Sequence, residues 1–96
     1  MSYADFLRED QRLVLLRILA DLPAYRSNSY VLSSALHQLG HAASADQIKA
    51  ELHWLAEQGL TRIEDHEGVL VVTLTERGAD VAAGRARVPG VRVPGP

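Results

Sequence analysis

The residues LHWLAEQGL (52–60), TRIEDHEGVLVVTL (61–74) and TERG (75–78) decide the fold of this chain. The first stretch has the apolar spacing of a helix and ends at Gly59, a residue that favours the conformation just past a helix C-terminus. The second has two runs rich in Ile, Val, Leu and Thr around Glu67-Gly68, the composition of a hairpin with glycine in its turn. Thr75 is suited to cap another helix. The sequence therefore predicts helix, hairpin, helix.

Two more helices are predicted before this stretch. Ser2-x-x-Asp5 has the pattern of a capping box and starts a helix over about 4–22, which Pro23 ends because the residue before a proline avoids helical geometry. Asn28 or Ser29 caps a second helix over about 30–39. Residues 24–27 between them are interpreted as a connection.

The helix that leads into the hairpin begins with a second capping box, Ser44-x-x-Gln47, and runs to Gln58. Only residues 40–43 separate it from the helix before, a turn short enough to fix the crossing of the two as in a helix-turn-helix unit. After the hairpin, a short fourth helix over 76–83 ends at Gly84.

The first helix carries apolar residues on two sides. The side expected against the core contains Leu7, Val14, Leu15, Ile18, Leu19 and Leu22. The other side has the three-four spacing of a helix–helix seam and contains Phe6, Leu13, Leu16 and Ala20. One interpretation is that this second side forms a homodimer; the alternative is a central helix wrapped by its own fold.

The composition changes at residue 85. The last twelve residues, RARVPGVRVPGP, are basic and repeat Val-Pro-Gly, which does not sustain a hydrogen-bonded ladder. We therefore predict a folded domain over 1–84 and a disordered, flexible tail over 85–96. Residues 1–76 hold six Lys or Arg against eleven Asp or Glu, whereas the remainder holds four Arg against one Asp, so the body is acidic and the tail basic.

The order αααββα, mainly helical with one small hairpin, is that of a winged helix-turn-helix. At 96 residues without cysteine, the chain fits one small domain that must be held by packing alone. It contains no leader-like segment and no apolar run near the roughly 20 residues that span a bilayer. We therefore expect a cytoplasmic protein with no membrane partner.

Two sets of residues carry resemblances to known families. The pattern Leu52-x-x-Leu55-x-x-x-Gly59-Leu60, joined to Leu74-Thr75-x-x-Gly78-x-x-x-Ala82, resembles the wing region of winged-helix regulators of the ArsR, MarR and PadR groups. More closely, SYADFLREDQR (2–12), LAEQGL (55–60) and RARVPGV (85–91) resemble a family of small ArsR-like proteins of Mu-like phages and prophages. This resemblance implies a phage or prophage regulator of transcription.

A helix-turn-helix protein that binds double-stranded DNA places the second helix of the unit in the major groove. The candidate DNA-binding residues are Arg26, Ser44, Gln47, Lys49, His53, Arg62, Arg85 and Arg87. Charge argues against this function, because residues 44–58 hold one Lys against three acidic residues and the hairpin tip is acidic as well. The alternative is a module that docks on a host or phage protein and does not bind DNA.

Catalysis and metal binding have little support in the sequence. Nucleophile motifs, phosphate-binding glycine loops and His-Glu-x-x-His are absent, so we expect no enzyme activity and no cofactor. His37 and His41 have the spacing of two ligands on one helix, but Gly40 interrupts them and no third ligand is evident, so no metal site is predicted. Trp54 is interpreted either as the edge of the core or as an exposed binding anchor. The sequence does not indicate which operator or partner is bound or which effector ligand acts. It also does not distinguish activation from repression.

Overall fold

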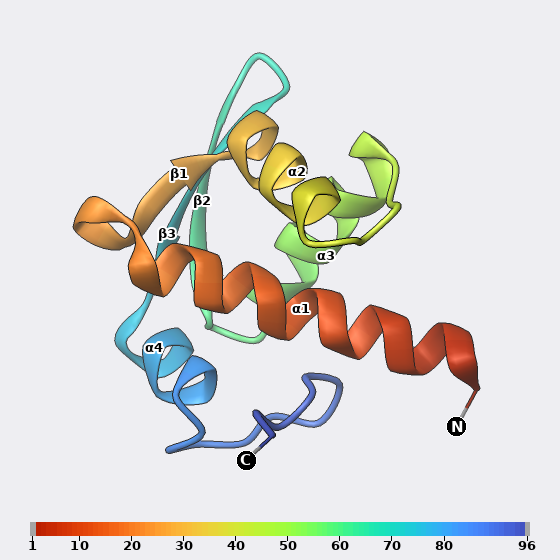
Figure 1. The fold of residues 1–96 in the computed structure, drawn as a ribbon. Helices are drawn as coiled ribbons and strands as arrows, with labels where there is room; N and C mark the ends of the chain where they lie inside the picture. Colours follow the sequence, from red (N-terminus) through yellow and green to blue (C-terminus); the bar gives the residue numbers. More distant parts are fainter. Residues whose placement is uncertain (1, 96) are drawn as a thin grey trace.

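Four α-helices surround one three-stranded antiparallel sheet in the computed structural model, which describes residues 2–95 (Figure 1). Both capping boxes form, at Ser2 and at Ser44, and Asn28 and Thr75 cap the two other helices as their sequences predicted. The elements are α1 (Tyr3–Asp21), the 3₁₀ turn η1 (Pro23–Tyr25), β1 (Arg26–Asn28), α2 (Ser29–Gln38), α3 (Ala45–Glu57), β2 (Thr61–His66), β3 (Val69–Leu74) and α4 (Glu76–Ala82).

The sheet has the order β1-β3-β2, with β3 in the centre. The strands β2 and β3 form the expected hairpin, in which the Gly68 N–H donates to Asp65 Oδ1 at 2.8 Å. The strand β1 corrects the prediction of a plain connection at 24–27. Ala24 and Tyr25 both have positive φ, a conformation that their side chains disfavour, and the resulting turn brings the next three residues alongside β3. Neither alanine nor tyrosine is typical of such a turn, so it could not be predicted from these residues.

The helix α1 lies in the middle of the molecule and packs against α2, α3, α4 and β3. Leu13 and Leu16, which were assigned to a dimer seam, are 1% and 0% exposed within the single chain. Leu15 and Leu19 on the other side are equally buried. Neighbouring elements surround the second half of α1, so both apolar sides are covered there. This agrees with the alternative interpretation, a central helix wrapped by its own fold. Leu13 and Leu16 are therefore not available to a second copy.

Residues 85–95 lie against the domain, which corrects the expectation of a disordered tail (Figure 1). Val88 and Val91 are 4% and 6% exposed and belong to the core cluster. The Arg92 backbone N–H donates to the Glu9 carbonyl at 3.2 Å, and its guanidinium pairs with Asp10 at 2.8 Å. The Pro-Gly repeats prevent this segment from joining a sheet by backbone hydrogen bonds. Contacts with α1 and with the core hold it in place instead.

The helix α4 approaches the start of β2 very closely at Gly78. A Cβ at this position would lie 2.1 Å from the Leu60 carbonyl oxygen and 2.6 Å from a methyl group of Leu74. Only glycine permits this contact, which seats α4 beneath the hairpin and beside α1. The complete arrangement is a small α+β fold consistent with a winged helix. No helix within residues 2–95 is both long and apolar enough to cross a membrane.

Candidate recognition surface

The outward side of α3 is open, as a recognition helix requires. Ile48, Leu52 and Leu55 face the core, while the opposite side of the helix is exposed. Its exposed residues are Ala45, Asp46, Gln47, Ala50, His53 and Glu57. This side therefore offers two acidic groups and one histidine.

Two of the predicted DNA-binding side chains are engaged within the helix cap. Ser44 Oγ accepts from the Gln47 N–H at 3.1 Å, and Gln47 Oε1 accepts from the Ser44 N–H at 2.8 Å. A base contact would have to compete with these two bonds. His53, by contrast, is exposed and has no polar partner within residues 2–95.

The cations nearest the hairpin lie beside its acidic residues. The Lys49 ammonium is 4.0 Å from the position that a Cβ would take at Gly68, in the hairpin turn. Arg26 on β1 pairs with Glu64 on β2 at 3.8 Å. Arg62 is exposed, and strand register places it opposite Thr73, with Arg26 on the other side of the same residue. Arg26 and Arg62 therefore share the outer face of the sheet.

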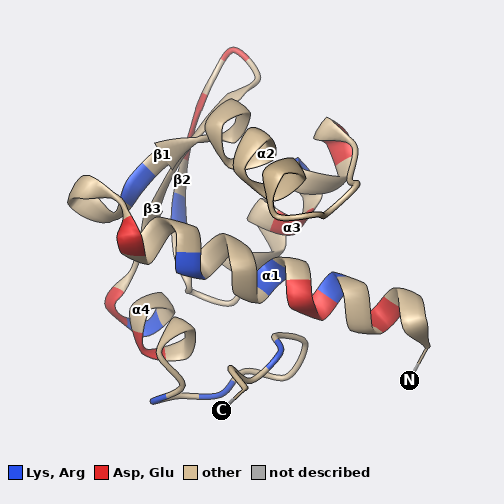
Figure 2. Ribbon diagram, viewed as in Figure 1, with Lys and Arg blue, Asp and Glu red and all other residues tan. Residues whose placement is uncertain are grey.

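We call the exposed side of α3 and the half-buried Lys49, together with Arg26 and the exposed residues of the hairpin, the α3–hairpin surface. Its cations are Arg26, Lys49 and Arg62, and its acidic residues are Asp46, Glu57, Glu64, Asp65 and Glu67. Three positive and five negative groups leave a net charge of −2. Figure 2 shows the acidic residues at the hairpin tip.

The tail arginines do not join this surface. Arg85 pairs with Asp80 of α4 at 2.9 Å, and Arg87 is exposed on the same segment. Figure 2 places this segment at the end of the molecule opposite the hairpin tip. The structure thus separates the eight predicted DNA-binding residues into α3, the sheet and the tail.

The exposed side of α2 is a feature that the sequence analysis did not single out. Tyr30 is 68% exposed and Val31 is 49% exposed, and the whole of Ser29–Gln38 contains no Lys, Arg, Asp or Glu. Ser29 Oγ accepts from the Leu70 N–H at 3.2 Å, which fixes the start of α2 against the hairpin. An uncharged, partly apolar face thus lies next to the acidic hairpin. The absence of Lys, Arg, Asp and Glu over these ten residues is visible in the sequence and could have indicated this face.

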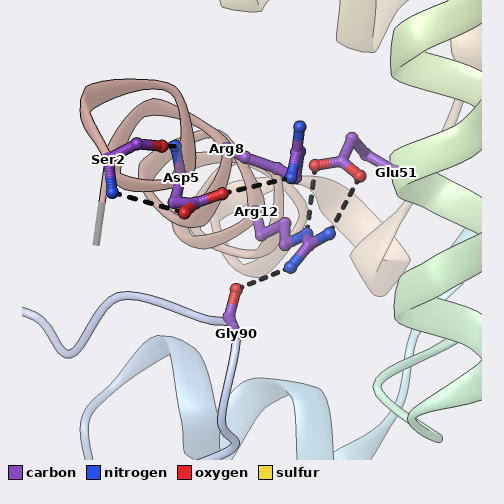
Figure 3. A network of polar contacts seen from close by, with 6 residues as sticks. All are labelled: Ser2, Asp5, Arg8, Arg12, Glu51 and Gly90. Atoms are coloured by element: carbon purple, nitrogen blue, oxygen red, sulfur yellow. Dashed lines mark hydrogen bonds and ion pairs between the residues drawn. The ribbon is translucent and has the colours of Figure 1, made fainter.

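A second unpredicted feature is a buried ion pair between α1 and α3 (Figure 3). Arg12 donates to both oxygens of Glu51, at 3.0 and 3.2 Å, and to the Gly90 carbonyl at 2.9 Å. Its guanidinium also lies 3.8 Å from the centre of the Trp54 ring. Trp54 is only partly buried and packs against the core, so it belongs to this contact at the core edge.

The two histidines with ligand spacing are each bonded elsewhere. His37 Nε2 lies 2.8 Å from the Ala43 carbonyl, and His41 Nε2 lies 3.0 Å from Asp10 Oδ2. Across residues 2–95, no three potential ligands gather in a way that could hold a metal ion.

The fold and surface define a small α+β protein with an open helix beside an acidic hairpin, and sequence comparison gives its family. Gp26 of Escherichia phage Mu, an uncharacterized protein, is 49% identical over 92 residues, which cover 96% of this chain and 95% of gp26. An uncharacterized protein of Haemophilus influenzae is 38% identical over 78 residues, covering 80% of this chain and 76% of the relative. No family model matches the chain. The chain belongs to the family of phage Mu gp26, a group of small phage-associated proteins.

Proposed function

We propose that the chain is a winged-helix module of phages and prophages that docks on a protein partner inside the bacterial host cell. In this proposal α2 and α3 form the helix-turn-helix unit and the β2–β3 hairpin is the wing. The observation that carries it is the net charge of −2 on the α3–hairpin surface, next to the uncharged side of α2. The proposed role is binding without catalysis.

The charge distribution favours a protein partner over DNA for a simple electrostatic reason. Affinity for DNA rests largely on Lys and Arg side chains that neutralise phosphates and release counterions. Here Arg26 pairs with Glu64, so binding a phosphate would require it to leave an acidic partner, and Lys49 lies against the turn of the acidic hairpin. Protein interfaces, in contrast, are depleted of charge at their centre and enriched in tyrosine. The exposed face around Tyr30 has that composition.

A dimeric DNA-binding regulator of transcription is the second candidate. It is favoured by the open outer side of α3 and by the short turn between α2 and α3. His53 and Arg62 are exposed and have no ion-pair partner within residues 2–95. For this function, these two residues would have to provide most of the contacts to the duplex, because Arg85 and Arg87 lie at the other end of the molecule.

Fluorescence anisotropy with labelled duplexes that together cover the phage's own DNA, so that any operator is present, distinguishes the two candidates. For the protein-docking function, we expect binding no tighter than the non-specific range of about 10⁻⁴ to 10⁻⁶ M near physiological salt. The matched variant Arg62→Glu should then change nothing beyond this weak background. Affinity in the range of about 10⁻⁸ M that falls steeply with salt and is lost in Arg62→Glu would establish the DNA-binding regulator instead.

A photo-crosslinking amino acid tests the protein-docking function directly. It is placed at Tyr30 in a host cell that carries the phage, and at exposed Ala83, the residue just after α4, as the control. We expect one protein to be captured from the Tyr30 position and not from Ala83. Equal capture from both positions, or nucleic acid as the only captured species, would reject the proposal.

A further inference from the structure

The first half of α1 extends beyond the part of the helix that the domain covers. The helix spans 19 residues, about 28 Å at 1.5 Å per residue, yet its buried residues begin only at Leu13. Figure 1 shows the N-terminal turns projecting past the rest of the molecule. Tyr3 and Phe6 on these turns are 76% and 41% exposed. Two aromatic side chains are thus presented on an exposed projection.

A groove lies beside the same turns, between α1 and α3. It has a volume of about 350 Å³, and Ala4, Leu7, Ala42 and Ala50 supply most of its apolar lining. Arg8 lies at its α1 side. Small residues on both walls leave room for a side chain from another molecule. Each copy therefore offers both an aromatic projection and a groove that could receive one.

The charges around this region nearly balance. Asp5, Glu9, Asp10 and Glu51 stand against Arg8, Arg12 and Arg92, four negative groups to three positive, and Arg12 and Glu51 already pair within the chain. Arg8 and Asp5 form an exposed pair at 3.5 Å, with about half of each side chain accessible. The same exposed pair on a second copy offers an opposite charge to each member, whereas the acidic hairpin repels its own kind. Paired charges beside apolar groups thus fit self-association better than a charged ligand.

We propose that two copies pair about a two-fold axis through the N-terminal turns of α1. Tyr3 and Phe6 of each copy enter the α1–α3 groove of the other, and Asp5 of each exchanges its Arg8 partner for that of the second copy. Such an interface is isologous, so every contact occurs twice and the assembly closes as a dimer. The pairing moves the dimer contact from Leu13 and Leu16 to the exposed end of the helix. The pairing does not rest on the docking function proposed above, although the groove shares Gln47 and Ala50 with the α3–hairpin surface.

Sedimentation equilibrium over a concentration series tests the pairing. In the double variant Tyr3→Asp/Phe6→Asp, we expect the dimer dissociation constant to rise by about 30-fold or more, the effect of losing aromatic anchors at an interface centre. Ala50→Arg, which fills the groove from the other side, should have the same effect. Tyr30→Asp removes an equally exposed tyrosine from α2 and should leave the dimer unchanged. Circular dichroism should show all three variants folded, because the replaced side chains are exposed.

Disulfide crosslinking gives an independent readout, because the chain has no cysteine of its own. Two single-cysteine proteins, Tyr3→Cys and Ala50→Cys, are mixed and oxidised. We expect a mixed dimer, and none when Tyr30→Cys replaces Tyr3→Cys. A chain that stays monomeric to about 1 mM, where association is worth only about 4 kcal/mol, would overturn the proposal. So would a dimer that survives both Tyr3→Asp/Phe6→Asp and Ala50→Arg.

Discussion

Arg12 joins three parts of the chain that are far apart in the sequence. Glu51 on α3 is 39 residues away and Gly90 is 78 residues away, yet both accept hydrogen bonds from the same guanidinium. A planar group with five donors can satisfy a carboxylate and a carbonyl at once while it stacks on an indole ring, which a lysine cannot do. The partly buried site also limits the competition from water that weakens exposed ion pairs.

Removal of Glu51 is expected to be more damaging than removal of the whole pair. Both side chains are only 12% exposed, so Glu51→Ala leaves an arginine charge buried and partly unpaired. We expect the free energy of unfolding in urea to fall by about 3 kcal/mol. The double variant Arg12→Leu/Glu51→Leu should be less destabilised, because no buried charge remains. If the loss of unfolding free energy in the double variant equals the sum of the losses from the two single substitutions, the ion pair does not act as a unit.

Residue-scale pairing of this kind could not be read from the sequence. Arg12 and Glu51 each look like ordinary surface charges of a helix, and nothing local to either position names its partner. Trp54 was recognised as informative, but whether it was core edge or anchor depended on the same unseen contact. The outcome for Arg26 is similar, since its partner Glu64 lies on a strand that comes close only after folding.

At the scale of elements, local signals predicted well and non-local ones did not. The caps at Ser2, Asn28, Ser44 and Thr75 act within three residues of their partners, and all four helices begin where these caps indicated. The strand β1 has only three residues and exists through its bonds to β3, which lies more than forty residues later. Helix periodicity likewise identified both apolar sides of α1 without showing that neighbours cover each of them.

The capping box of α1 makes the first turn sensitive to acid. The Ser2 backbone N–H donates to the Asp5 carboxylate at 3.3 Å (Figure 3). This bond first, and then the neighbouring Ser2 hydroxyl, hold the pKa of Asp5 below its usual value. A pKa lower in the folded than in the unfolded state stabilises the fold above the unfolded pKa. This contribution is lost as the pH falls through the folded pKa. The contribution is small because the carboxylate is exposed.

Amide chemical shifts of the first turn measure this prediction. As the pH falls below the range in which an ordinary aspartate titrates, we expect the amide resonances of Ser2 and Asp5 to move toward frayed-helix values. The variant Asp5→Asn should lack this transition while keeping the rest of the spectrum. The same pH profile in both proteins would contradict a role for the carboxylate.

At the scale of the whole molecule, the distribution of charge rather than the total charge limits the function. The formal net charge is only −2, but the basic groups of the last residues lie on the α4 side and the acidic groups of the hairpin lie at the other end. The sequence predicts this asymmetry together with a flexible tail, whose arginines could then contact a DNA duplex. The packed position of residues 85–95 removes that freedom, which is why the structure weakens the DNA-binding hypothesis beyond the charge count.

The packed tail gives the last prediction, because it makes the C-terminal residues part of the core. A chain ending at Arg87 keeps the cap of α4, where the Arg85 N–H donates to the Asp80 carbonyl, but loses buried Val88 and Val91. At about 1.5 kcal/mol for each buried valine, we expect the free energy of unfolding to fall by about 3 kcal/mol.

Trp54 fluorescence should shift to the red in the chain ending at Arg87, since Gly90 normally covers the indole ring. The matched control ends at Arg92 and retains Val88, Gly90 and Val91. It should therefore have nearly full stability and unchanged fluorescence. Equal stability of all three chains would instead restore a separate, mobile tail and, with it, the freedom of its arginines to reach a nucleic acid.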